Sequence, residues 1–147
     1  MYSYSPDNIR EIDHTADIGL HADGNTLPEL YANLAFGMIH IIAGDVEVCE
    51  NNFLHIEIDE KSETDLIVSW LSEINYHLSV HHFLPSVINK LIIHTTDDGI
   101  LLEADLGGVN ILNQTIELKT EIKAITYHQL KFEKTEHGYL SQVIFDI

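Results

Sequence analysis

The closing segment, residues 120–147, constrains the fold more than any other stretch of the chain. Two runs rich in Tyr, Ile, Val, Phe and Thr flank a short turn at residues 135–138. Such composition is typical of two paired β-strands joined by a turn. The last residues are strand formers around one carboxylate, Phe145-Asp146-Ile147. Because a terminus frays unless the fold holds it, we expect these residues to be docked in the sheet.

A docked end would place the Asp146 side chain close to the main-chain carboxylate of Ile147. Two anions held together favour a cation, and hard oxygen ligands suit Ca²⁺, Mg²⁺ or Mn²⁺ rather than Zn²⁺. Asp17 is a candidate third ligand, in a polar segment near the start of the chain. Spacing alone does not bring residues 17 and 146 together. The alternative is that Asp17 caps a turn while Asp146 is a solvated end residue.

The composition predicts a single globular domain over residues 1–147, since 45% of the residues are hydrophobic. No apolar run approaches the length needed to span a bilayer, and the first residues carry neither the basic nor the apolar region of a secretory signal. Cys49 is the only cysteine, which excludes an internal disulfide and fits a reducing compartment. We expect a soluble, cytoplasmic protein.

The formal net charge of −17 comes from 24 acidic and 7 basic residues. Such a surface repels RNA and DNA, whose binding depends on Lys and Arg contacts to phosphate. We therefore expect no direct nucleic-acid binding, so that any role in nucleic-acid metabolism would act through a protein partner or a metal. The alternative is that the charge serves only solubility.

The pattern along the chain predicts the order β-α-β-α-β-β-β-β. Strands are predicted at residues 18–22 and 46–59, and a helix between them begins at Thr26 and ends at Gly44. A second helix follows Ser62. Residues 87–96 and 100–106 then form a hairpin around an Asp-Gly turn, residues 107–114 a loop, and the closing hairpin follows. This order indicates the α+β class, with a mixed or antiparallel sheet layer and two helices packed on it.

Histidines at two other places in the sequence suggest different chemistries. His77 and His81 stand four apart on the second helix, as many zinc ligands do, but no third ligand is evident and the helix dipole also favours histidines there. His14 with Asp17 could act as a general base in a small metal-dependent hydrolase. No nucleophile and no phosphate-binding loop accompanies them, so the sequence predicts no catalytic residue.

Four segments together resemble the archease family. They are HTADIG at residues 14–19, DLIVSWL at 65–71, LKTEIKAITYH at 118–128 and VIFDI at 143–147. The resemblance runs over essentially the whole chain, and the last two segments are the most specific. One departure lies in residues 107–116, where the family often carries an acid, a proline and a histidine that this chain lacks.

The resemblance implies a non-enzymatic activator of the RtcB-type tRNA-splicing RNA ligase. Family members promote guanylylation and multiple turnover of that ligase, and they can broaden its nucleotide use. They bind a divalent ion, assigned as calcium, at positions that correspond to Asp17, Asp146 and Ile147. A general folding helper or interaction module for RNA-modifying proteins is the alternative. The resemblance leaves the oligomeric state open.

Overall fold

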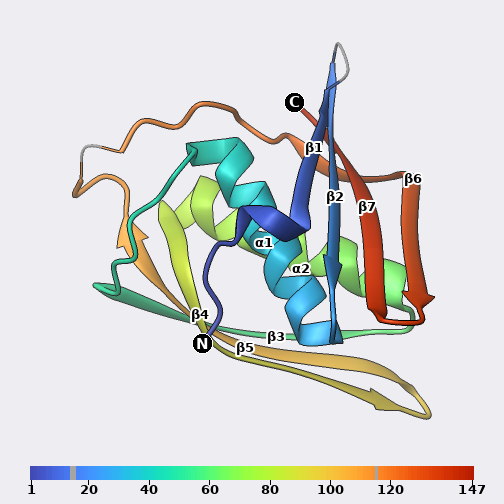
Figure 1. Cartoon of the computed structure of the whole chain (residues 1–147). Coiled ribbons are helices and arrows are strands. Elements are labelled where there is room, and N and C mark those ends of the chain that lie inside the picture. Colours follow the sequence, from blue (N-terminus) through green and yellow to red (C-terminus); the bar gives the residue numbers. More distant parts are fainter. Residues whose placement is uncertain (14–15, 115) are drawn as a thin grey trace.

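The computed structural model describes residues 1–13, 16–114 and 116–147, which form two helices and seven strands in two antiparallel sheets (Figure 1). A 3₁₀ turn at Pro6–Asn8 precedes them. The elements are β1 (Ile9–Asp13), β2 (Asp17–Gly24), α1 (Leu27–Ala43), β3 (Asn52–Glu60), α2 (Glu63–His81), β4 (Phe83–Thr96), β5 (Gly99–Asn110), β6 (Ala124–Thr135) and β7 (Gly138–Asp146). This is the α+β class that the sequence predicts.

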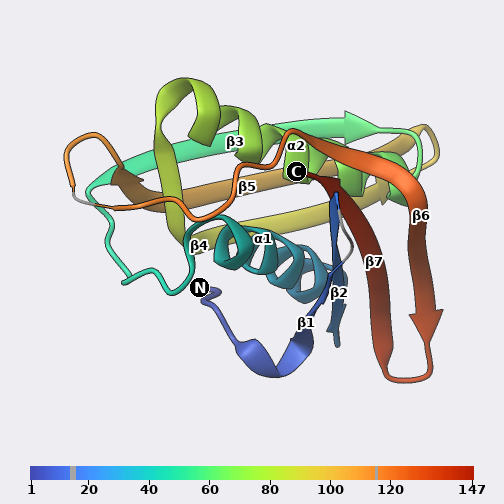
Figure 2. The ribbon, with the colours of Figure 1, turned by 90° about the horizontal axis from the view of Figure 1, so that it is seen from above.

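The two helices lie between the sheets. One sheet has the strand order β1-β2-β7-β6 and the other β3-β5-β4, and the two cross at a steep angle in Figure 1. Helix α1 contacts β2 of the first sheet and β4 of the second, while α2 contacts β6 and β3 (Figure 2). One hydrophobic cluster joins all these elements. Each sheet therefore has one face on the helices and an opposite face directed away from them.

Side-chain caps fix where each helix begins. The Thr26 hydroxyl accepts a hydrogen bond from the backbone N–H of Glu29, and the Glu29 carboxylate accepts one from the N–H of Asn25. The Ser62 hydroxyl does the same for the N–H of Asp65 at the start of α2. These bonds satisfy donors that the first helical turn leaves without partners. Both predicted helix starts are confirmed.

The predicted order of elements is confirmed, with the short strand β1 added in front of it. The closing hairpin also turns where the sequence predicts, between Thr135 and Gly138. The prediction of a strand from residue 46 was wrong for residues 46–51. There the Cys49 backbone N–H and carbonyl both bond to the Ser86 hydroxyl, so a side chain takes the place of a strand partner.

The predicted loop at residues 107–114 was also wrong in its first half, because β5 continues to Asn110. Gly107 and Gly108 lie inside this strand, and Gly108 packs so closely on β4 that a Cβ there would come within 2.1 Å of the Leu84 carbonyl oxygen. Glycine here permits close backbone approach. Strand β4 likewise begins earlier than predicted, at Phe83, with Pro85 at a register shift.

Within the described residues, neither helix has the length and apolar character that a membrane crossing requires.

Candidate metal centre

Asp17 and Asp146 lie directly opposite each other on neighbouring strands. They are partners in the antiparallel β2–β7 ladder and form its last pair at one end. Directly opposed residues of such a pair project to the same face, with Cβ atoms about 4.5–5.5 Å apart. Asp17 is half-buried and Asp146 is exposed. The two candidate ligands that the sequence could not connect are therefore neighbours.

The end of the chain is held from both sides. The backbone N–H of Lys123 donates to the Asp146 carbonyl at 2.8 Å, and Ala124 is the β6 partner of Asp146. On the other side, the N–H of Ile147 donates to the Ala16 carbonyl at 3.4 Å. Ile147 is half-buried, with its side chain against the core. The main-chain carboxylate thus follows directly after a fixed strand, and the expectation of a docked end is met.

Apolar neighbours position this pair. Ile18 and Phe145 are the next partners along the ladder, and Phe145 is fully buried. Side chains alternate between the faces of a strand, so seating Phe145 in the core turns Asp146 to the opposite face. A one-residue slip would reverse both, which makes the register costly to change. The core therefore determines where the carboxylates point.

The electrostatics of the pair favour a cation. Like charges directly opposite each other destabilise a sheet. In the parts of the chain that the structure describes, neither Asp17 nor Asp146 forms an ion pair with a Lys, Arg or His. Two side-chain carboxylates beside a main-chain carboxylate supply only oxygen ligands, which is the donor set of Ca²⁺, Mg²⁺ and Mn²⁺. The residues present fit such an ion.

His14 lies outside the described residues, so its suggested role as a base has no structural counterpart here. The other alternative, a zinc site on α2, lacks a converging set of ligands. His77 contacts Glu73 at 3.0 Å and its ring centroid lies 5.4 Å from that of His81. Among the side chains that the structure describes, only a group on β3 and β5 brings three metal-binding residues together, and it includes neither histidine.

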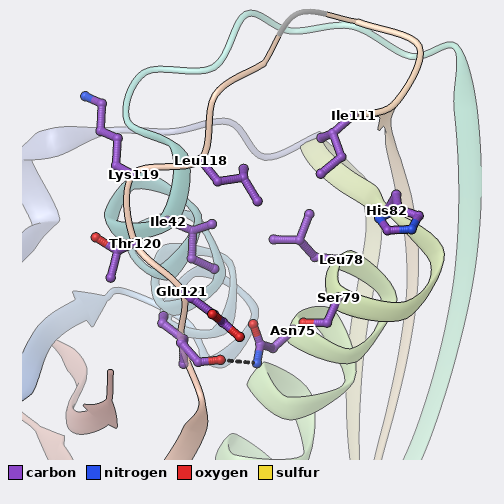
Figure 3. A pocket seen from close by; sticks show the side chains of 11 residues that line it. Ile42, Asn75, Leu78, Ser79, His82, Ile111, Leu118, Lys119, Thr120 and Glu121 are labelled. Carbon is purple, nitrogen blue, oxygen red and sulfur yellow. Dashed lines mark hydrogen bonds between the residues drawn. The ribbon is translucent and has the colours of Figure 1, made fainter.

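A cavity of about 370 Å³ lies between the two helices and residues 118–122, and sequence reasoning missed it. Residues 118–122, here called the strap, cover it on one side and lead into Lys123 and Ala124. The Lys119 and Thr120 N–H groups donate to the Ile42 carbonyl of α1, and the Asn75 side chain of α2 donates to the Ile122 carbonyl. Figure 3 shows Ile42, Leu78, Ile111 and Leu118 directed toward the middle of this space.

The strap ties the two helices to the end of the chain. Its hydrogen bonds reach α1 and then α2, and the next residue, Lys123, bonds to the Asp146 carbonyl. Such an arrangement depends on contacts between segments far apart in the sequence. No local pattern in residues 118–122 signals it.

The chain is similar to proteins of one family. A model of the archease protein family matches residues 10–147. Proteins named archease from Methanosarcina acetivorans and Saccharolobus islandicus are 32% and 31% identical, over 92% of this chain and 93% and 95% of their own lengths. The solution structure of protein 1598 from Methanobacterium thermoautotrophicum is similar, with a TM-score of 0.83 and 27% identity over 95% of this chain and 99% of that one.

A crystal structure from Thermotoga maritima has a TM-score of 0.63 and 23% identity, over 94% of this chain and 96% of that one. That protein is described as an archease and a possible chaperone. At this identity the likeness supports the fold alone.

Proposed function

The chain belongs to the archease family, and from that premise we propose that it is a non-enzymatic activator of an RtcB-type RNA ligase in tRNA splicing or RNA repair. In this proposal it promotes guanylylation of the ligase active-site histidine and lets the ligase turn over repeatedly. Asp17, Asp146 and the carboxylate of Ile147 hold a divalent ion, with Ca²⁺ the first candidate and Mg²⁺ or Mn²⁺ the alternatives. The direct partner is the ligase protein and not RNA.

The opposition of Asp17 and Asp146 across β2 and β7 carries this proposal. It brings two carboxylates and the chain end together at one end of the β2–β7 ladder, where Asp146 is exposed to a second protein. A divalent ion at such a site neutralises charge and orients phosphate groups. The chain's own part is to hold the carboxylates in a fixed register, through the buried Phe145 and the Lys123 hydrogen bond.

The net charge supports action through a protein. With 24 acidic and 7 basic residues, the chain has little capacity to bind phosphate backbones. An acidic surface attracts a basic protein surface and speeds the encounter with it. RNA-binding enzymes carry such basic surfaces. The charge that excludes direct RNA binding is thus compatible with docking on an RNA ligase.

The decisive experiment is multiple-turnover RNA ligation with a limiting amount of purified RtcB-type ligase. We expect wild-type protein to restore turnover, and Asp146→Asn and Asp17→Asn to lose most of that effect. Glu136→Gln, which removes an equal charge in the exposed turn of the closing hairpin, serves as the matched control and should activate like wild type.

Equal activation by all four proteins would keep the partner and refute the carboxylate site. If none activates a cognate ligase, the activator role fails. The general folding-helper role would then be tested by client solubility, which that role predicts to be independent of Asp17 and Asp146.

A further inference from the structure

Four side chains with metal-binding chemistry meet on the outer face of the three-stranded sheet, away from the helices. His55 is the ladder partner of Asp105. Glu57 is the ladder partner of Glu103, two residues away on each of the same strands. Residues two apart on a strand share a face, so all four side chains project to one side. Their sequence neighbours Ile56 and Ala104 are buried on the opposite side. The pairing of β3 with β5 therefore brings the four side chains to one face.

The imidazole of His55 is oriented for a ligand. Its Nδ1 hydrogen-bonds to the Asp105 carboxylate, and its Nε2 lies 3.1 Å from Oε1 of Glu57. A metal-binding histidine commonly has its other ring nitrogen bonded to a carboxylate, which fixes the ring and strengthens the ligand. In that arrangement Nε2 is the coordinating atom. Nε2 faces Oε1 of Glu57, so that an ion bound by both residues would lie against these two atoms.

The spacing suits a small divalent ion. Ligand atoms of His55, Glu57 and Glu103 all lie within 4.8 Å of one another. Neighbouring ligand atoms of tetrahedral zinc are about 3.3 Å apart, given bonds of about 2.0–2.1 Å. The Nε2–Oε1 distance is already close to that value. Glu57 and Glu103 sit at the surface, so modest rotation of their side chains closes the remaining gap.

The charges around the group favour a cation. Asp105, Glu57 and Glu103 place three carboxylates beside the His55 imidazole on this face. Lys90 of β4 opposes a cation here, since its Nζ lies 2.7 Å from Oε1 of Glu103. Removing that lysine would leave three carboxylates and one imidazole on a single face.

We propose that His55 Nε2, Glu57 and Glu103 form a second metal site that binds a divalent transition-metal ion of the zinc type, with Asp105 as the residue that orients the imidazole. A nitrogen ligand distinguishes this site from the all-oxygen centre at Asp17 and Asp146, because imidazole suits Zn²⁺ and Co²⁺ whereas Ca²⁺ takes oxygen. The two sites lie on different sheets. This inference is independent of the proposed function.

The test is calorimetric titration with Zn²⁺, in the presence of excess Ca²⁺ so that the all-oxygen centre is already filled. We expect one zinc ion to bind wild-type protein. Asp105→Asn should weaken binding by about ten- to a hundredfold, as loss of an orienting carboxylate does, and His55→Gln should weaken it further. His137→Gln, which removes another exposed histidine, should bind zinc as wild type does.

Lys90→Met supplies the sharper comparison, because a metal site that includes Glu103 predicts tighter zinc binding in this variant. Removing the competing ammonium group should tighten zinc binding about two- to fivefold, the worth of an exposed ion pair. Imidazole NMR signals should identify His55 as the ring that responds to zinc. Thermal unfolding without metal shows whether each variant is folded, so that weaker binding is not mistaken for unfolding.

Three results would overturn the proposal. Zinc binding that survives His55→Gln would place the ion elsewhere. Zinc binding lost in Asp146→Asn but kept in His55→Gln would assign it to the end of the chain. No saturable zinc binding by folded wild-type protein would leave these residues as a solvated row of hydrogen-bonded charges.

Discussion

The side-chain amide of Asn75 donates a hydrogen bond of 2.9 Å to the carbonyl of Ile122, linking α2 to the strap. The next residue along, Lys123, donates its N–H to the Asp146 carbonyl. One helix side chain therefore helps to position the backbone that holds the end of the chain.

Asn75→Ala should loosen the strap and weaken Ca²⁺ binding. Loss of the hydrogen bond costs about 1 kcal/mol of stability, since the Ile122 carbonyl loses its partner. Amide hydrogen exchange at Thr120 and Lys123 should accelerate. Ser79→Ala is the matched control, because Ser79 lines the same cavity and has no hydrogen bond to residues 118–122 in the described structure. Equal Ca²⁺ affinity for the two variants would refute the coupling.

Trp70→Phe should cost about 2–4 kcal/mol. The indole of Trp70 is fully buried, and its N–H donates to the Tyr31 carbonyl at 2.9 Å, joining α2 to α1. The smaller ring leaves a cavity and removes this bond. Urea unfolding followed by circular dichroism measures the loss, since the chain has no other Trp to report by fluorescence. Tyr76→Phe, on an exposed part of the same helix, should change stability by less than about 0.5 kcal/mol.

Tyr127→Phe should raise the pKa of Asp65 toward its ordinary value of 3.8. In the folded protein that pKa is lowered, first by the Tyr127 hydroxyl and then by the Ser62 hydroxyl, both of which donate to the carboxylate. The unfolded chain therefore binds a proton more readily. The stability contributed by these bonds is complete above pH 3.8 and is lost as the pH falls through the lower, folded value.

An NMR titration of the Asp65 carboxyl carbon measures this shift directly. Tyr139→Phe is the control, because the Tyr139 hydroxyl makes no hydrogen bond to a carboxylate among the residues described. A midpoint unchanged by Tyr127→Phe would mean that the hydroxyl does not determine the pKa of Asp65.

Local signals in the sequence predicted local structure well. Thr26 and Ser62 mark helix starts because a cap bonds to a backbone group only three residues away. The turn before Gly138 was predictable for a similar reason, since turn residues interrupt two strand-forming runs. Errors arose where a distant segment decides the outcome. Gly108 continues a strand because Leu84 packs against it, and nothing near Gly108 in the sequence indicates that contact.

In the candidate metal site, too, residue types were predictable from the sequence, whereas contacts between distant segments were not. The chemistry of Asp17 and Asp146 was readable from residue types, but their contact depends on the register of β2 against β7. That register follows from Phe145 entering the core, a tertiary effect. The resemblance to a family supplied the connection that physical reasoning on the sequence left open. The His55 group was missed because Glu103 joins it only through the pairing of β3 with β5.

Asp146→Asn should have opposite effects on stability with and without metal. In a chelating buffer the variant should be more stable than wild type by about 0.2–1 kcal/mol, because two opposed carboxylates repel each other across a ladder. With Ca²⁺ added, wild type should gain about 1.4 kcal/mol for each tenfold excess of Ca²⁺ over its dissociation constant, whereas the variant should gain little. Thermal unfolding in the two buffers measures both effects. Glu136→Gln should follow wild type in each, since the turn that carries Glu136 lies at the other end of β7 from Asp146. A variant less stable than wild type in chelator would show that the pair is not repulsive, and the electrostatic argument for a cation at Asp17 and Asp146 would fail with it.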